Sequence, residues 1–367
     1  MQIGILGFQR SGKTTVFNAL TGSHAQTTGH GGGKARVNMA VVKVPDERLD
    51  RVAELIKPQK VTHATVEYVD VAGIERSDVE NRTGLGEEQL QALSHTDALL
   101  VVIRAFDDGS GIAPDCRGDL EAIKLELILS DLQKIENRLP RLGKLVKKVT
   151  GREKEQALLE QAALEKIKTH LEMERSIRSM TLSPEEDKAV RGFTFLSQKP
   201  ILFLLNVGED QLSAEKSGYD LTSFSEEKEQ KGEKTNVASM CARIEEEISQ
   251  LSPEESALFL QDYHIPEPAS RRVIRLCYDL LGYISFFTAG PRELRAWTIT
   301  RGTPAVRAAG AVHSDFERGF IRAEVIHWDR YIEVGGYFEA RKAGLLRIEG
   351  KEYIVQDGDI CNFLFNV

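Results

Sequence analysis

The N-terminal loop of the chain limits its fold more than any other feature of the sequence. The pattern Gly-x-x-x-x-Gly-Lys-Ser/Thr is met by the consecutive residues Gly7, Phe8, Gln9, Arg10, Ser11, Gly12, Lys13 and Thr14. An apolar run at residues 2–6 predicts a buried strand before the loop, and residues 14–20 have the spacing of a helix after it. A glycine-rich loop between a strand and a helix predicts a phosphate-binding loop, in which backbone N–H groups face the phosphates of a nucleotide.

The polar groups of this loop and of a second motif have expected roles. Lys13 is predicted to contact the β- and γ-phosphate oxygens, and Thr14 to ligate Mg²⁺ through its hydroxyl, with Thr15 beside it in the nucleotide-binding set. Asp70 and Gly73 follow an apolar strand and form Asp-x-x-Gly. Asp70 is expected to hold Mg²⁺ through water, and the Gly73 N–H to sense the γ-phosphate. The sequence therefore predicts a magnesium-dependent hydrolase of purine nucleoside triphosphates, with Lys13 and Gly73 in catalytic roles.

A third motif indicates which base the site prefers. Asn206 and Glu209 follow the apolar run at 200–205, where a GTPase carries Asn-Lys-x-Asp. Aspartate there accepts two hydrogen bonds from guanine, and glutamate is one methylene longer, so its carboxylate would be misplaced and guanine preference lost. Ile74 stands where many GTPases place a glutamine that orients the attacking water. Because isoleucine cannot hydrogen-bond water, we expect a low intrinsic rate.

The remaining hydrophobic pattern predicts an α/β architecture. Apolar runs at 61–71, 98–103 and 200–205 alternate with helical patterns, which predicts a mainly parallel sheet with helices on both faces. Between the last two runs, apolar residues recur every three or four positions from 125 to 149, and a second helical pattern follows a turn, so an antiparallel coiled-coil-like hairpin is expected. After about residue 281, short strand patterns and glycine turns predict a small α+β domain.

The inserted hairpin is more basic than the rest of the chain. Residues 134–168 hold ten lysines or arginines against five glutamates, whereas the whole chain has a formal net charge of −8. Such an excess forms either a solvated helix face or a contact with RNA phosphates, and the residues alone favour neither. The acidic chain as a whole is not expected to coat nucleic acid, and no DNA contact is expected.

The cysteines and the apolar stretches exclude other classes of protein. The four cysteines are far apart and form no Cys-x-x-Cys pair, so neither a zinc ribbon nor a disulfide framework is expected. No apolar stretch approaches the roughly 20 residues that a membrane span needs. The N-terminus lacks the basic segment and cleavage site of a secretory signal. These features predict a cytoplasmic protein without membrane contact, which we expect to be a monomer.

The whole chain resembles the YchF-type branch of the Obg-like ATPases. Its C-terminal part looks like the TGS domain of that family at residues 287–290, 295–299, 315–325, 357–359 and 365–367. The rest resembles the family at residues 84–86, 104–106 and 126–139, at Asn206 with Glu209, and at Cys241 with Ala242. The last pair matches the base-side loop after the final strand of the sheet, so Cys241 and Ala242 join the predicted nucleotide-binding residues.

The resemblance implies an organisation and an activity. Residues 1–118 and 196–280 would form a P-loop nucleotide-binding G-domain, 119–195 a coiled-coil insertion, and 281–367 a TGS domain with a ubiquitin-like β-grasp fold. The family implies an ATPase that prefers ATP over GTP, requires Mg²⁺ and associates with ribosomes through its coiled coil and TGS domain. On this basis the basic segment 134–168 is expected to contact ribosomal RNA or a ribosomal protein.

The phosphate-binding loop departs from the family pattern at two positions. Arg10 stands where the family usually has asparagine, and Thr14 where it has serine, which keeps the hydroxyl. In relatives with a hydrophobic residue at the position of Ile74, that asparagine can help to bind a potassium ion near the phosphates. Our hypothesis is that the Arg10 guanidinium replaces the ion and acts as an arginine finger in cis. The alternative is that Arg10 points to solvent.

Two further departures concern turnover. The glycine-rich stretch 24–36 replaces a compact switch segment and leaves Thr27 and Thr28 as weak candidates for a second Mg²⁺ contact. The loop at 107–119 lacks the histidine that relatives commonly carry. Two other functions therefore stay open, a true GTPase and a nucleotide-sensing scaffold with negligible turnover. A metabolic kinase is disfavoured because no lid-like arginine cluster or acceptor site is visible.

Overall fold

The computed structural model describes residues 1–22, 38–75, 85–211, 236–263 and 265–366. The chain divides into two compact units. The first consists of Met1–Ala40 and Glu67–Val273, and the second of Val41–Val66 and Ile274–Val367. Within the described parts of the chain, no helix is both long enough and apolar enough to cross a membrane.

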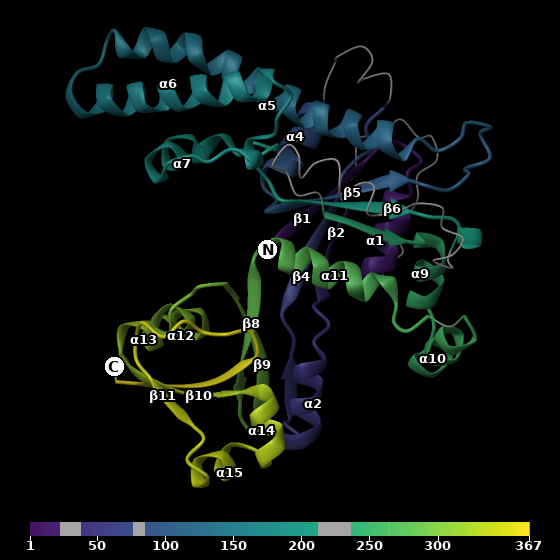
Figure 1. Ribbon diagram of the computed structural model, residues 1–367, viewed down its shortest axis with the longest axis vertical. Helices are drawn as coiled ribbons and strands as arrows, with labels where there is room; N and C mark the ends of the chain where they lie inside the picture. The colour runs from purple at the N-terminus through teal and green to yellow at the C-terminus, as the bar shows by residue number, and fades with distance from the viewer. Residues whose placement is uncertain (23–37, 76–84, 212–235, 264, 367) are drawn as a thin grey trace. The chain divides into compact units, whose positions relative to one another are not determined.

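The first unit is built on a sheet of strand order β2-β4-β1-β5-β6-β7 (Figure 1). The strands are β1 (Gln2–Gly7), β2 (Asn38–Lys43), β4 (Thr65–Asp70), β5 (Ala98–Arg104), β6 (Ile201–Asn206) and β7 (Asn236–Met240). The pairs β1 with β4, β1 with β5, β5 with β6, and β6 with β7 are parallel. Every residue of β5 and β6 is buried, as expected for strands covered on both faces. The predicted α/β fold with a mainly parallel sheet is therefore confirmed.

The helices of the first unit connect strands of this sheet, belong to the insertion between β5 and β6, or follow β7. They are α1 (Lys13–Thr21), α4 (Glu87–Ser94), α5 (Cys116–Val146), α6 (Gly151–Glu172), α7 (Pro184–Val190), α9 (Ala242–Ser249), α10 (Pro253–Asp262) and α11 (Ala269–Leu280), the last of which continues into the second unit. The carboxyl ends of β1, β4 and β6 meet at one edge because the strands run in parallel. The three predicted nucleotide motifs follow these three strands.

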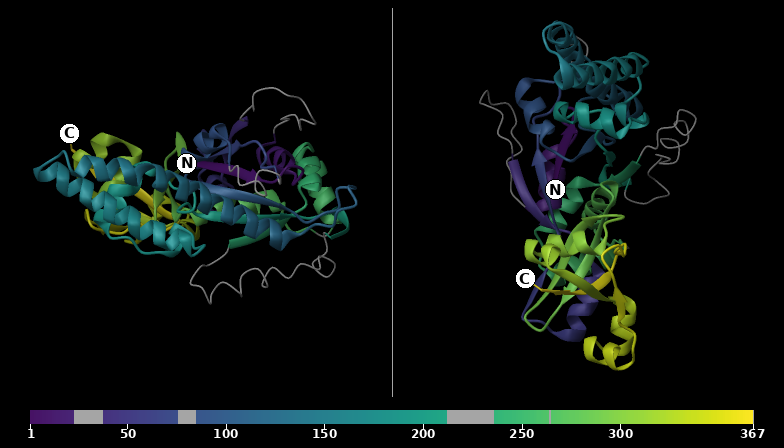
Figure 2. Two further views of the ribbon diagram at one scale, coloured as in Figure 1. Left: turned by 90° about the horizontal axis from the view of Figure 1, so that it is seen from above. Right: turned by 90° about the vertical axis from the view of Figure 1, so that its left-hand side faces the viewer.

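Helices α5 and α6 form the predicted antiparallel hairpin, and their arms run side by side in Figures 1 and 2. The N-terminal half of α5 packs on the sheet through Ile123 and Leu127, and its C-terminal half packs with α6 through Ile135 and Leu142. The single helix α5 therefore contributes side chains to two apolar cores. It begins at Cys116, before residue 119. The division of the chain at 119 and 195 stays a prediction.

The second unit contains a six-stranded sheet of order β11-β10-β12-β8-β9-β3. The strands are β3 (Lys60–Thr62), β8 (Tyr283–Ala289), β9 (Glu293–Thr300), β10 (Phe320–His327), β11 (Arg347–Glu349) and β12 (Asp359–Phe365). The helices are α2 (Glu47–Ile56), α12 (Ala305–Val312), α13 (Ser314–Arg318), α14 (Trp328–Val334) and α15 (Tyr337–Lys342). Its apolar core is formed by residues such as Phe286, Val325 and Phe363. The expected α+β character is present, and the TGS assignment stays a prediction.

The sequence pattern misassigned one segment. The apolar run at 61–71 was expected to form one strand of the N-terminal domain, but it divides into β3 and β4. β4 pairs with β1 in the first unit, whereas β3 pairs in parallel with β9 of the second. Residues 41–66 therefore belong with the C-terminal residues, because β3 completes their sheet.

Candidate nucleotide site

The loop after β1 has the backbone that the motif requires. Gly12 has a φ of 88°, in the left-handed region, and a Cβ there would collide with the side-chain amide of Asn206. Arg10 adopts a φ of 62° although it carries a side chain. The loop is thus held in the sharp turn from which α1 begins.

Lys13 lies folded over this loop. Its Nζ donates a hydrogen bond of 2.8 Å to the carbonyl oxygen of Phe8, and the residue is buried. Burial lowers the pKa of Lys13 to about 8, against the opposing effect of the Asp70 carboxylate. A Cβ on Gly73 would lie 2.6 Å from the same Nζ, so the second motif lies directly against the lysine.

Thr14 and Asp70, the two predicted magnesium ligands, lie within hydrogen-bond distance of each other. The Thr14 hydroxyl donates to Asp70 Oδ2 at 3.2 Å, and Asn38 Nδ2 donates to the same oxygen at 3.2 Å. Burial raises the pKa of the Asp70 carboxyl, so a nearby cation would favour its ionised form. A hydroxyl and a carboxylate suit Mg²⁺, which keeps several waters and takes its remaining ligands from phosphates. The described residues contain no group of three or more His, Cys, Asp or Glu that could hold a metal ion.

The backbone of Ile74 ties the second motif to the loop. Its N–H donates to the Gly7 carbonyl oxygen at 3.0 Å, and its own carbonyl oxygen accepts from the Gln9 N–H at 2.9 Å. The Ile74 side chain is 1% exposed and packs in the sheet core with Leu6 and Phe8. It therefore points into the protein interior and cannot orient a water molecule.

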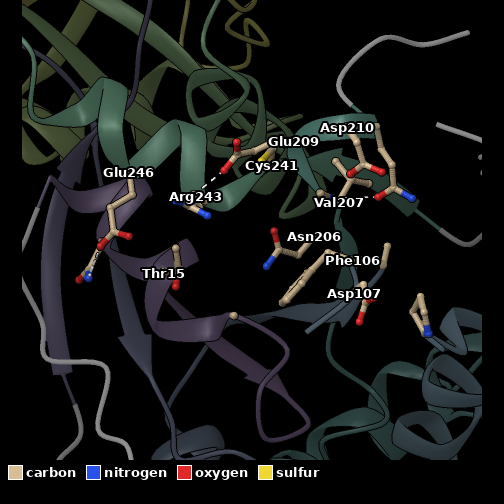
Figure 3. Close-up of a pocket in the computed structure, with 16 residues that line it drawn as sticks. Thr15, Phe106, Asp107, Asn206, Val207, Glu209, Asp210, Cys241, Arg243 and Glu246 are labelled. Atoms are coloured by element: carbon tan, nitrogen blue, oxygen red, sulfur yellow. Dashed lines mark hydrogen bonds and ion pairs between the residues drawn. The ribbon is translucent and has the colours of Figure 1, made fainter. Parts of the chain in front are cut away.

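A cavity of about 970 Å³ adjoins the loop and is shown in Figure 3. The predicted residues that line it are Gly12, Thr15, Asn206, Glu209 and Cys241. Its size is within the range of small-molecule sites. The other lining residues were not predicted: Asn18, Ala105, Phe106, Asp107, Pro114, Val207, Gly208, Asp210, Gln211, Arg243 and Glu246.

Asn206 links the loop to the cavity. Its Nδ2 donates to the Ser11 carbonyl oxygen at 3.0 Å, and its Oδ1 accepts from the Ala242 N–H at 3.0 Å. The side chain is 4% exposed, so both contacts are buried. Ala242 therefore takes part through its backbone, and Cys241, whose thiol has a pKa raised by burial, forms part of the cavity wall.

Glu209 is paired with a residue that the sequence did not single out. Its Oε1 lies 3.1 Å from Nε of Arg243, at the start of α9, and Figure 3 draws this contact across the cavity. Glu246, one turn further along α9, accepts a hydrogen bond of 2.7 Å from Asn18 of α1. The order of the strands could have indicated α9, because it follows β7 at the same sheet edge.

The loop after β5 lies near Arg10. Arg104 pairs through NH1 with Asp108 Oδ1 at 2.6 Å and donates through NH2 to the Ile112 carbonyl oxygen. The hydrogen bond from Ser110 holds the pKa of Asp108 below its usual range, and the Arg10 guanidinium acts in the same direction. Arg10 is thus within electrostatic reach of this loop, although its side chain is exposed. Thr27 and Thr28 lie outside the described residues.

Comparisons with known proteins find relatives over nearly the whole chain. A family model described as "50S ribosome-binding GTPase" matches residues 2–139, and a C-terminal YchF GTPase model, described as "Protein of unknown function (DUF933)", matches residues 283–366. "Ribosome-binding ATPase YchF" of Bacillus subtilis (strain 168) is 40% identical over 369 residues, with 99% of each chain covered. The protein of that name from Haemophilus ducreyi is 42% identical over 368 residues, again with 99% of each chain covered.

A solved structure supports the same relationship over nearly the whole length. The structure of the Schizosaccharomyces pombe YchF GTPase matches with a TM-score of 0.82 and 28% identity, covering 99% of this chain and 97% of the other. This similarity includes both units and not the phosphate-binding loop alone. With full-length relatives at about 40% identity and an agreeing fold, the chain belongs to the YchF family.

Proposed function

We propose that the chain is a ribosome-associated switch that binds ATP with Mg²⁺, in preference to GTP, and hydrolyses it slowly. One observation carries the proposal: Asn206 joins the phosphate-binding loop to an adjoining cavity, so one nucleotide can span both. The names of the relatives, "Ribosome-binding ATPase YchF", support ATP as the substrate and the ribosome as the partner.

The residues of the loop have distinct roles in this proposal. The phosphates take the place of the Phe8 carbonyl oxygen at Lys13 Nζ, so the ammonium exchanges a neutral partner for charged oxygens. Thr14 and Asp70 would hold Mg²⁺, directly and through water respectively, and a bound ion would supply positive charge to the phosphates. Gly73 lies against Lys13 and offers its N–H to the γ-phosphate. The loop residues Gly7 to Ser11 and Thr15 complete the cradle.

Slow turnover follows from the position of Ile74. Its side chain is buried in the sheet core, so it offers no polar group to the attacking water. Another group must position the water, and a ribosomal partner can supply or order it. Phosphate release in a single turnover, with and without ribosomes, tests this idea. Acceleration by ribosomes is expected, whereas the absence of both a burst and an acceleration would favour the scaffold.

Arg10 is our candidate for a positive charge supplied in cis. The left-handed backbone at Arg10 leaves its side chain exposed beside the phosphate-binding loop, within electrostatic reach of Asp108. If its guanidinium stands in for a monovalent cation, hydrolysis will be similar in sodium and in potassium. Replacing Arg10 by Asn is then expected to lower the rate in sodium and to introduce a requirement for potassium. Strong potassium dependence of the native chain would refute this role.

The basic residues of the hairpin support contact with ribosomal RNA or protein. Part of the basic excess is paired internally, since Arg138 contacts Glu160 through two hydrogen bonds of 2.8 and 3.0 Å, and Lys168 lies 3.2 Å from Glu136. The exposed basic residues near the tip are Arg141, Lys144, Lys147, Lys148, Arg152 and Lys154. Exposed cations at one end of a projecting hairpin suit RNA phosphates.

Replacing Lys147, Lys148 and Arg152 by glutamate is expected to weaken co-sedimentation with ribosomes by about tenfold or more. Each contact between a cation and an RNA phosphate releases counterions and so favours binding, and this contribution is lost with the contact. Binding should be compared in ATP, in ADP and without nucleotide. The matched control reverses three exposed cations that follow the hairpin, Arg175, Lys188 and Arg191, and so changes the net charge by the same amount. Equal loss in both variants would show that the chain's net charge, rather than the hairpin tip, governs association.

A further inference from the structure

The carboxylate that stands in the base-reading position is not alone in the cavity. Glu209 Oε1 forms an ion pair with Arg243 Nε at 3.1 Å, and Arg243 also lies 3.7 Å from Glu247, one turn further along α9. Among the described residues that line the cavity, Arg243 is the single lysine or arginine. The same lining holds the acidic residues Asp107, Glu209, Asp210 and Glu246, and of these Arg243 pairs with Glu209.

The contact with Arg243 affects base recognition through the carboxylate oxygens of Glu209, which are the hydrogen-bond acceptors for the base. Guanine presents two adjacent donors, N1–H and the N2 amino group, and a carboxylate satisfies both only with both oxygens. Adenine presents a single amino donor, N6, on the corresponding edge. A guanidinium near Oε1 competes with a base for that oxygen and constrains the orientation of the carboxylate, whereas Oε2 stays open. Adenine needs only one acceptor, but guanine needs both oxygens in one plane with its two donors, so the contact disfavours guanine.

We infer that Arg243 is a specificity-determining residue, which acts by holding one oxygen of Glu209 and so disfavours guanine. This inference rests on the proposed function, because it concerns the base of the same nucleotide. Arg243 is a positioning residue and needs no contact with the phosphates. The contact is partly solvated, since the side chains of Arg243 and Glu209 are 75% and 49% exposed, so its effect on specificity is moderate.

Replacing Arg243 by alanine tests the inference through the ratio of two affinities. GTP is expected to bind about three- to tenfold more tightly relative to ATP, because Arg243 no longer competes with guanine for Oε1 of Glu209. The loss of one positive charge changes the affinities for ATP and GTP by the same factor, and this factor cancels in their ratio. The matched control is Glu247→Ala, which removes the other partner of Arg243 and leaves the contact with Glu209 in place. It should leave the ratio within about twofold of the native value.

A double-mutant cycle separates this role from a general effect on the cavity. In a Glu209→Ala background, replacing Arg243 is expected to leave the ratio of GTP to ATP affinity unchanged, because the carboxylate through which it acts is gone. An equal change with and without Glu209, or no change in either, would overturn the inference. If the native chain binds neither triphosphate, the proposed function itself fails. Titration calorimetry with both nucleotides on all four proteins distinguishes these outcomes.

Discussion

Lys13→Ala is expected to lower the affinity for ATP by about a hundredfold or more and to reduce hydrolysis to background. The side chain can supply charge-assisted hydrogen bonds to phosphate oxygens, and two such contacts contribute about 3 kcal/mol or more together. Folding should survive, because burial already disfavours the charged amine: it lowers the pKa of Lys13 to about 8. Calorimetric titration with ATP and thermal unfolding measure the two effects separately.

The control for this substitution is Lys148→Ala, which removes an exposed lysine from the hairpin. It should bind ATP like the native chain. Lys13→Arg keeps the charge but is too large for the space beside Gly73, so it should also bind poorly. ATP binding by Lys13→Ala at native affinity would mean that the nucleotide lies elsewhere.

Asn206→Ala is expected to be the most damaging change in the site for stability, and to weaken ATP binding as well. It leaves the Ser11 carbonyl oxygen and the Ala242 N–H buried without their partner, and each such group costs about 1 to 3 kcal/mol. The free energy of unfolding should therefore fall by about 2 to 4 kcal/mol. ATP affinity should fall by about tenfold or more, because the hydrogen bonds that fix the position of the loop beside the cavity are lost. Urea unfolding and calorimetry measure these quantities.

A matched control exists for the loss of an amide. Gln198→Ala removes a side chain whose amide contacts Asp187 at 3.3 Å in a partly buried position away from the loop. Its free energy of unfolding should change by less than about 1 kcal/mol. If Asn206→Ala proves as mild as this control, the link between loop and cavity does not hold the site together.

The phosphate end of the site could be predicted from sequence because it is encoded locally. Gly12, Lys13 and Thr14 are fixed by the sharp turn between a strand and a helix, and a spaced motif records that turn. Asp70 could be added because parallel strands bring their carboxyl ends to one edge. The structure places its carboxylate 3.2 Å from the Thr14 hydroxyl, in agreement with that prediction.

The rest of the site depends on contacts between distant parts of the chain. Arg243 lies on an exposed helix surface, where its type and spacing resemble those of any solvated residue. Only the strand order that places α9 beside the cavity makes it notable. The division of 61–71 into β3 and β4 was missed for the same reason, since both strands have similar composition and differ only in the sheet they join.

Titration of the native chain with ATP and with GTP, in the presence of Mg²⁺, tests the central claim most directly. It examines the loop, the cavity and the Glu209 substitution in one measurement. ATP is expected to bind more tightly than GTP by about tenfold or more, because Glu209 pairs poorly with the two donors of guanine. GTP binding that equals or exceeds that of ATP would contradict it.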